Sequence, residues 1–320
     1  MNDFPLVSVI ILSYKQMQYI FGAIDSVMSQ GYPNIELIIA DDGTDEFEID
    51  DVQDYVAHNN SGNITNAIVI KNEVNVGTVK NLNGALNAAG GEYIMFFAGD
   101  DLHTTDSISK SVAFMESNNR DFFMAAGHTI PFNDGDDVNS VEIAKDPKIH
   151  EMFAMEPKDR YVHMCKKGVL IASIAAHIFR REFFIKEGLF DERYRLYEDR
   201  PMLLRIARQG YRVGYLDFSI LFYRTNVGVS TGGSIHLAYD IKMLAEYEYW
   251  PNVDLLGKRF CRRYQKMNDC VYELRANYSQ WSLPQKILFG IKKFDVIAFR
   301  ILPTWGILSL IRRLRKYSTK

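Results

Sequence analysis

The feature that most constrains the fold is an alternation of apolar runs and helical patterns over the first hundred residues. Four runs are apolar and long enough for buried strands: LVSVIIL (6–12), IELIIA (35–40), AIVIKN (67–72) and EYIMFF (92–97). The segments between them have helical spacing: near residues 48–58 and 78–89, and in the first segment at Ile20, Ala23, Ile24, Val27 and Met28. Strands that alternate with helices predict an α/β fold with a doubly wound, mainly parallel sheet flanked by helices.

Polar or acidic loops follow these strands. They are Ser13-Tyr14-Lys15, Asp41-Asp42-Gly43, Asn72 to Gly77 and Gly99-Asp100-Asp101. In open parallel sheets, ligands bind outside the carboxyl ends of the strands. We therefore expect these loops to form a ligand site at one edge of the sheet.

The second half of the sequence is less regular. It indicates a helix at 105–117, a polar loop at 131–148 as a candidate lid or acceptor loop, mixed structure at 168–188, a helix at 197–210, and two short strands (YRVGYL and SILFYR) that end at Arg224. We expect one domain over 1–225, with a first part over 1–103 and a second part over 104–225. A helical region is expected over 226–320.

Two acidic pairs follow buried strands. Asp100 and Asp101 repel each other unless water solvates them or a cation lies between them, and Mg²⁺ or Mn²⁺ bridging a diphosphate suits such carboxylates. Asp41-Asp42-Gly43 fits a simple turn, and it also fits a carboxylate that binds a base or ribose. Together, on two strands of one sheet, the pairs favour a nucleotide site.

A third acidic pair, Glu198-Asp199, opens the helix at 197–210. Acids at a helix N-terminus are favourable without any further function. A carboxylate at the mouth of the site can also act as a general base toward a hydroxyl.

The chain resembles the family 2 inverting glycosyltransferases of the GT-A fold, which include enzymes of bacterial lipopolysaccharide and capsule assembly. The resemblance covers roughly residues 5–225 and implies a catalytic domain over 1–225, with a nucleotide-binding half (1–103) and an acceptor half (104–225). It rests on motifs in the family's order: PLVSVIILSYKQ, ELIIADDGTDE, NVGTVKNLNGALNAAGGEYIMFFAGDD and GLFDERYRLYEDRPMLLRIARQGY.

This resemblance implies a nucleotide-sugar donor, usually a UDP-sugar, and a divalent metal, Mn²⁺ or Mg²⁺. It implies that Asp199 is the catalytic base and that Asp101 is the metal ligand. The nucleotide-sugar-binding residues that it implies or suggests are Ser13, Tyr14, Asp42, Lys80, Asn83 and Asp100. The chain departs from the common family pattern at Leu12, Leu82 and Ala98.

The chemistry of these residues agrees with the resemblance. Asp199 would take the proton of the acceptor hydroxyl, and a metal at Asp101 would stabilise the leaving diphosphate. One base without a covalent intermediate gives inversion. We expect a hexosyltransferase that acts on a saccharide or undecaprenyl-diphosphate-linked acceptor in O-antigen or capsule assembly.

The alternatives come from other classes. A non-catalytic scaffold or nucleotide-sugar-binding protein of this fold would have lost the base or the metal acid. A nucleotide-binding oxidoreductase would carry G-x-G-x-x-G after the first strand, and this chain does not. His177 and His236 could each approach a metal, but ordinary core or surface histidines are the favoured interpretation.

Charge is unevenly distributed along the chain. Residues 286–320 carry nine Lys or Arg and one acid, Asp295, which gives a charge of +8. Because the net charge of the whole chain is −3, the remaining residues carry −11. The acidic body argues against a nucleic-acid partner. Three cysteines without C-x-x-C spacing, no signal peptide and no long apolar run predict a cytoplasmic protein without a membrane span.

The basic tail predicts a helix over 285–302 that ends at Pro303, followed by a second apolar and basic segment, WGILSLIRRLRKY. Lys286, Lys293 and Arg300 lie on one stripe of that helix. Two interpretations stay open: a helix that packs on the catalytic domain, or a pair of interfacial helices on the inner face of the cell membrane. We favour the peripheral membrane interpretation.

Overall fold

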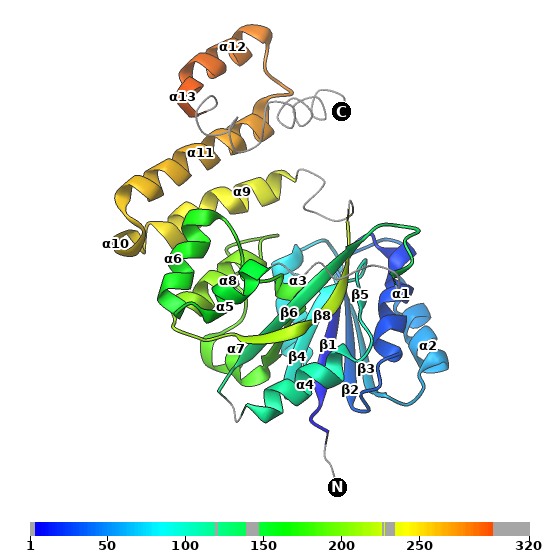
Figure 1. Ribbon diagram of the computed structural model, residues 1–320. Helices are drawn as coiled ribbons and strands as arrows, with labels where there is room; N and C mark the ends of the chain where they lie inside the picture. Colours follow the sequence, from blue (N-terminus) through cyan, green and yellow to red (C-terminus); the bar gives the residue numbers. More distant parts are fainter. Residues whose placement is uncertain (1–3, 119–120, 139–146, 226, 228–233, 297–320) are drawn as a thin grey trace. The chain divides into compact units, whose positions relative to one another are not determined.

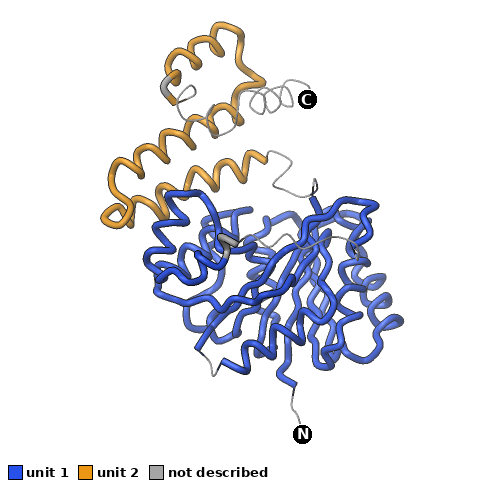
Figure 2. Tube along the Cα trace, in the orientation of Figure 1, with its two compact units in different colours: residues 1–231 blue, residues 232–320 orange. Residues whose placement is uncertain are grey.

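A computed structural model describes residues 4–118, 121–138, 147–225, 227 and 234–296 of the chain. By its internal contacts the chain divides into two units, residues 1–231 and 232–320 (Figure 2).

The first unit contains a central eight-stranded sheet with helices around it (Figure 1). Its order is β3-β2-β1-β4-β7-β6-β8-β5. The strands are β1 (Val7–Ser13), β2 (Ile35–Asp41), β3 (Ile64–Lys71), β4 (Tyr93–Ala98), β5 (Leu102–His103), β6 (Met124–Phe132), β7 (His177–Arg180) and β8 (Gly214–Arg224).

The helices of this unit are α1 (Met17–Met28), α2 (Ile49–Asn59), α3 (Thr78–Ala88), α4 (Ser107–Ser117), α5 (Pro147–Ala154), α6 (Pro157–Lys167), α7 (Arg181–Glu187) and α8 (Asp199–Arg208), with a 3₁₀ turn η2 (Ile174–Ala176). They confirm the helices predicted in the first half and at 105–117 and 197–210.

The first four strands confirm the predicted parallel arrangement. β1 pairs in parallel with both β2 and β4, and β2 pairs in parallel with β3. The other half of the sheet is mixed, because β7 runs antiparallel to β4 and β6, whereas β6 and β8 are parallel. The carboxyl ends of β1, β2 and β4 therefore lie at the same edge.

Alternation along each central strand builds two apolar layers. Val7, Val9 and Ile11 of β1 belong to a core cluster with the buried faces of α1, α2 and α4. α3 packs against β1 and β2. In α1 the buried residues are the ones that the helical spacing predicts, namely Ile20, Ala23, Ile24, Val27 and Met28.

Two predictions about the second half differ from the structure. The segments YRVGYL and SILFYR are not two strands: residues 214–224 form the single strand β8, which pairs with both β6 and β5. The predicted loop at 131–148 is shorter, because β6 extends to Phe132 and α5 begins at Pro147. Part of that loop, 139–146, lies outside the described residues.

The second unit is helical in the part that the structure describes. It contains α9 (Ile235–Leu244), a π-helical segment η3 (Ala245–Tyr249), α10 (Val253–Leu256), α11 (Lys258–Asn277), α12 (Leu283–Lys292) and α13 (Phe294–Val296). The helix predicted over 285–302 instead ends at Lys292. Residues 297–320, which include the predicted second segment WGILSLIRRLRKY, lie outside the described residues. No helix among the residues described is long and apolar enough to cross a membrane.

Candidate active site

All four predicted loops meet at the carboxyl edge of the sheet. The backbone N–H of Asp42 donates to the carbonyl of Ser13 (2.8 Å), and the N–H of Gly99 donates to the carbonyl of Leu12 (2.7 Å). The loops after β2 and β4 are thus each bonded to the end of β1. The loop after β3 joins them, since the N–H of Asn72 donates to the carbonyl of Asp41 (2.9 Å).

The first loop is held in an unusual conformation. Lys15 has a φ of 56°, which is rare for a residue with a side chain. Its N–H donates to Thr44 Oγ1 (2.7 Å), and the Thr44 hydroxyl donates to Asp41 (2.8 Å). Tyr14 is 38% exposed, with Lys15 Nζ 5.3 Å from its ring centroid. The buried Ser13 hydroxyl has no hydrogen-bond partner among the described residues.

Asp42 organises the loop after β3. Its two carboxylate oxygens accept hydrogen bonds from the side chains of Asn72 (3.1 Å) and Asn75 (2.8 Å) and from the N–H groups of Val76 and Gly77 (both 2.8 Å). The side chain is 3% exposed. Asp42 therefore lies in the predicted site, and its carboxylate holds the 72–77 loop.

The two predicted nucleotide contacts on α3 have different surroundings. Lys80 is exposed, and it makes no hydrogen bond or ion pair with Asp42, Asp100 or Asp101 within the described chain. Asn83 is 3% exposed, and its amide binds the segment before α8: Nδ2 donates to the carbonyl of Phe190 (2.9 Å), and Oδ1 accepts from the Phe190 N–H (3.0 Å). Asn83 thus joins α3 to the segment that precedes α8.

Asp100 and Asp101 are both buried at the end of β4, 5% and 3% exposed. Burial raises the pKa of the Asp101 carboxyl to about 8, and the neighbouring charge of Asp100 adds to that rise. The Arg224 N–H, which donates to Asp101 Oδ1 (2.8 Å), and the Arg224 charge oppose it. Burial also raises the pKa of Asp100, opposed in part by Arg224 and by a hydrogen bond from Gln16.

Arg224, the last residue of β8, is a site residue for which the sequence interpretation proposed no role. Its Nε donates to the carbonyl of Asp100 (2.8 Å), and its guanidinium lies 4.4 Å from the ring centroids of both Tyr19 and Phe132. It also pairs with Asp134 in the turn after β6. The Arg224 guanidinium therefore supplies part of the positive charge that offsets the repulsion between Asp100 and Asp101. Its position at a strand end was the only signal in the sequence.

The donor set suits the divalent metal that the resemblance implies. Mg²⁺ is commonly held by one or two carboxylates together with waters and substrate phosphates. Asp100 and Asp101 supply two adjacent carboxylates whose burial disfavours their charge, so a cation would relieve that cost. No cluster of three or more His, Cys, Asp or Glu suited to a metal occurs among the described residues. The remaining ligands would have to come from substrate or water.

Asp199 is the first residue of α8. Burial raises the pKa of its carboxyl, opposed by the N–H and the charge of Arg200. The Arg200 guanidinium is itself fixed by a hydrogen bond to the carbonyl of Met164 (2.7 Å). A carboxyl with a raised pKa is a better proton acceptor once ionised, which suits the predicted general base.

Neither His177 nor His236 belongs to a cluster suited to a metal among the residues that the structure describes. His177 is fully buried on β7, its Nδ1 lies 2.8 Å from the carbonyl of Ser173, and burial lowers its pKa to about 4. It is thus a neutral core histidine. His236 lies exposed on α9.

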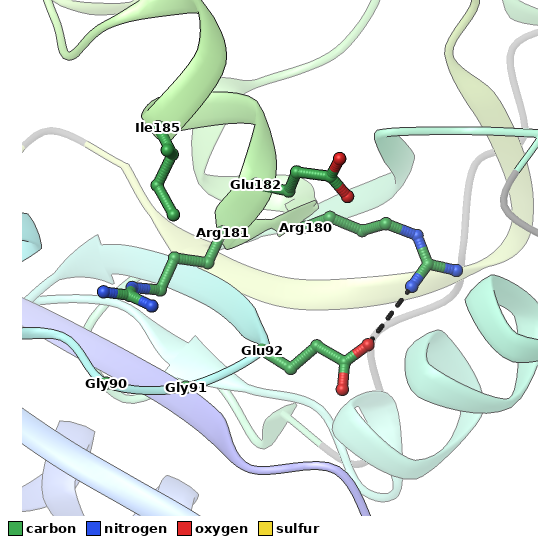
Figure 3. Close-up of a pocket in the computed structure, with 7 residues that line it drawn as sticks. All are labelled: Gly90, Gly91, Glu92, Arg180, Arg181, Glu182 and Ile185. Carbon is green, nitrogen blue, oxygen red and sulfur yellow. Dashed lines mark ion pairs between the residues drawn. The ribbon is translucent and has the colours of Figure 1, made fainter.

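A cavity of about 350 Å³ lies elsewhere in the first unit. Figure 3 shows its lining residues: Gly90, Gly91, Glu92, Arg180, Arg181, Glu182 and Ile185. It adjoins the beginning of β4, whereas Asp100 and Asp101 follow the end of that strand. Arg180 is occupied there by ion pairs with Glu92 and Glu116 (both 3.6 Å). This cavity is separate from the candidate site.

Comparison with known proteins identifies the family of this chain. The model of the family described as glycosyl transferase family 2 matches residues 8–188, which is more than half of the chain. That range includes β1 to β4, with every acidic loop at the edge described above.

Two curated relatives cover most of the chain. An Escherichia coli protein named UDP-Glc:alpha-D-GlcNAc-diphosphoundecaprenol beta-1,3-glucosyltransferase WfaP is 30% identical over 70% of this chain and 78% of its own length. The uncharacterized glycosyltransferase EpsJ of Bacillus subtilis is 26% identical over 76% of this chain and 68% of its own length.

Solved structures share the fold at low identity. S. aureus TarS 1-349 in complex with UDP-GlcNAc has a TM-score of 0.55 and 18% identity, covering 98% of this chain and 88% of that one. The mannosyltransferase PcManGT from Pyrobaculum calidifontis, in complex with GDP-Man and Mn²⁺, has a TM-score of 0.56 and 16% identity, covering 99% and 84%. From the family match, the relatives and the fold together, this chain belongs to glycosyl transferase family 2 and is a glycosyltransferase with a GT-A fold.

Proposed function

We propose that this glycosyltransferase moves a sugar, with inversion, from a UDP-sugar to a hydroxyl group of a lipid-linked saccharide in the assembly of a surface polysaccharide such as O-antigen or capsule. The observation that carries the proposal is the buried Asp100-Asp101 pair at the carboxyl edge, beside the end of β1. Burial disfavours the charge of both carboxylates there, and a divalent cation with a diphosphate would balance it.

In the proposed reaction, Asp199 accepts the proton of the acceptor hydroxyl while the oxygen of that hydroxyl attacks the anomeric carbon of the donor sugar. The bond from that carbon to the diphosphate breaks in the same step, so the configuration inverts. A metal held by Asp101 would supply positive charge to the leaving diphosphate. Ser13, Tyr14, Lys80 and Asp100 are proposed to contact the nucleotide-sugar.

The donor and acceptor classes rest on the relatives. WfaP is named for a UDP-glucose donor and a diphosphoundecaprenol-linked acceptor, and TarS was solved with UDP-GlcNAc. An undecaprenyl-diphosphate-linked saccharide is therefore the acceptor class that we propose for this chain.

The test begins with thermal unfolding of the protein with UDP or GDP, each with and without Mn²⁺. A ligand at 100 times its Kd stabilises the folded state by about 2.7 kcal/mol. Stabilisation by UDP that requires Mn²⁺, and that Asp101→Ala weakens, would support the proposal. Stabilisation by GDP alone would contradict the UDP assignment.

The base is tested by Asp199→Asn, assayed as sugar transfer to an undecaprenyl-diphosphate-linked acceptor. Loss of a general base lowers the rate by about 10² to 10⁴-fold, and UDP binding should persist. Asp159→Asn is the matched control, because Asp159 also lies in the first turn of a helix, α6, and is exposed. Unchanged turnover in Asp199→Asn would remove Asp199 from this role. UDP binding without transfer by the wild type would favour a scaffold protein.

We also propose that the second unit attaches the enzyme peripherally to the inner face of the membrane through α12. This helix has no buried residue, and four of its large apolar side chains are 50–70% exposed: Leu283, Ile287, Leu288 and Ile291. Phe289 instead packs against Trp281 and the Cys270 cluster. Lys286 instead lies over the ring of Tyr278, which follows α11 (4.5 Å to the centroid), and Lys293 pairs with Glu273 on α11 (3.2 Å). The occupant that we propose for the apolar face is an anionic lipid surface, because residues 286–320 carry a charge of +8.

Flotation with vesicles of phosphatidylglycerol and phosphatidylcholine tests this attachment. Ile287→Glu with Ile291→Glu should abolish flotation, because the changes place charge on the apolar face. Ile185→Glu is the control, since Ile185 is a 70% exposed isoleucine on α7. Unchanged flotation of the double variant would overturn the proposal. Dimerisation of the wild type that the double variant loses, without flotation, would assign the face to a second copy instead.

A further inference from the structure

The segment that leads into Asp199 is bonded to elements on the nucleotide side of the sheet. Asn83 on α3 binds both backbone groups of Phe190, and its Nδ2 also donates to Glu192 (3.0 Å). These residues are more than a hundred positions apart in the chain. Tertiary contacts therefore determine where the segment before α8 lies.

Arg195 lies in the same segment, four residues before Asp199, and contacts the loop after β3. Its Nη2 donates to the backbone carbonyl (2.8 Å) and to the side-chain oxygen (2.6 Å) of Asn75. Its own carbonyl accepts a hydrogen bond from the N–H of Val79 (3.2 Å). Arg195 thus binds both the backbone and the side chain of Asn75 in the loop after β3.

The same loop is held from the other side by Asp42, which accepts from the Asn75 amide and from the Val76 and Gly77 N–H groups. Asn75 therefore stands between the acid at the end of β2 and Arg195. Its Nδ2 donates to Asp42 while its Oδ1 accepts from Arg195.

The packing at Gly77 shows how closely the two segments meet. A Cβ at this position would lie 2.5 Å from Arg195 Cγ and 2.7 Å from the Arg195 carbonyl oxygen. Gly77 also has a φ of 98°, which side-chain-bearing residues rarely adopt. The loop and the Arg195 segment therefore leave no room to shift independently.

We propose that Arg195 is a positioning residue, through which the 75–77 loop on the nucleotide side sets the segment that carries Asp199. The proposal rests on the proposed transfer reaction, because it gives Asp199 the role of base. In this role Arg195 acts through Asn75. A residue with a purely structural role would change only the free energy of unfolding. A positioning residue also changes the kcat of the folded enzyme.

Hydrogen exchange of the 190–198 amides tests the coupling directly. Asn75→Ala should speed exchange there by about tenfold or more, because losing a pair of bonded partners weakens the segment that they hold. Arg195→Gln should do the same. Arg193→Gln is the matched control: it removes a cation from the same segment, and Arg193 is 57% exposed with its ion pair to the nearby Asp191. Unchanged exchange at 190–198 in Asn75→Ala would overturn the proposal.

Turnover tests the positioning role. The probe is hydrolysis of UDP-glucose, UDP-galactose or UDP-N-acetylglucosamine, in which water takes the sugar and UDP is released, assayed below the unfolding transition. Arg195→Gln and Asn75→Ala should each lower kcat about tenfold, and the double variant should lose no more than the worse single variant, since both break one connection. The role would be rejected if the losses of the two single variants multiplied in the double variant. It would also be rejected if the kcat of Arg195→Gln lay within twofold of that of Arg193→Gln.

The two kinds of failure are distinguishable. If the wild type neither binds UDP nor releases it from any of these donors, the proposed function fails, and hydrogen exchange still decides whether the loop and the segment are coupled. If the wild type turns over a donor and the Arg195 variants match Arg193→Gln, the function stands and this inference fails.

Discussion

Two Asp-Asp pairs lie at the same edge of the sheet, after β2 and after β4, yet their surroundings differ. Asp41 accepts from the N–H (2.6 Å) and hydroxyl (2.8 Å) of Thr44, and Asp42 accepts four hydrogen bonds from the 72–77 loop. Asp101 receives the Arg224 N–H, and burial raises the pKa of both acids of its pair. All four carboxyl groups are buried.

The difference shows that an acidic dipeptide acquires its role from the donors around it. Where N–H groups surround the carboxylates, the negative charge is compensated inside the protein, and the acids organise loops. Where donors are few, the charge is left for an external cation to balance. The first pair therefore shapes the site, and the second pair is the better candidate for the metal.

The largest expected effect comes from Asp42→Asn. Its amide NH₂ would face N–H donors of the 72–77 loop and leave them unsatisfied in a buried place, which we expect to destabilise the fold by about 4 kcal/mol. Urea unfolding measures this change. A loss of less than about 1 kcal/mol would mean that the loop does not depend on the Asp42 charge.

The same isosteric change at the second pair should have the opposite sign. Asp101→Asn removes a buried carboxyl whose charge is disfavoured, so in EDTA at pH 7 the variant should be more stable by roughly 3 kcal/mol. The measurement is again urea unfolding. If Asp101→Asn destabilises the metal-free protein as Asp42→Asn does, the contrast between the two pairs is wrong.

The pH dependence of stability sharpens this contrast. Because the pKa of Asp101 is raised to about 8, the folded state binds a proton that the unfolded state has already released between about pH 4 and 8. Asp101 should therefore make stability fall by about 1 kcal/mol per pH unit as the pH rises through this window. The difference between wild type and Asp101→Asn, followed by urea unfolding in EDTA, isolates that slope. A difference that does not change with pH would contradict it.

The smallest expected effect concerns the loop beside these pairs. Lys15→Gly should stabilise the fold by about 0.5 to 1 kcal/mol, because glycine adopts a positive φ without strain. Asp106→Gly is the control, since Asp106 has a φ of 58° at the start of α4, away from the site. If Lys15 is held strained for function, its variant alone should lose UDP affinity. Equal affinity in both variants would make that strain incidental.

Much of the fold could be predicted from local patterns. The first four strands, the helices between them and the parallel order follow from apolar runs and helical spacing, because buried parallel strands and amphipathic helices leave clear periodicities. β8 was misread as two strands, since Asp217 and Ser219 interrupt its apolar run. Pairing with β6 and β5 on either side keeps the strand continuous.

The sequence by itself determined the type of sheet, the edge that holds the acidic loops and, through resemblance, the family. Only the tertiary structure decided what each polar side chain does there. Asp42 and Asp101 have the same carboxyl group. Asp42 accepts hydrogen bonds from a loop about thirty residues later in the chain, whereas Asp101 accepts one from the N–H of Arg224, the last residue of β8. Solvation and hydrogen bonding of a buried charge depend on such distant neighbours, which a local sequence pattern does not record.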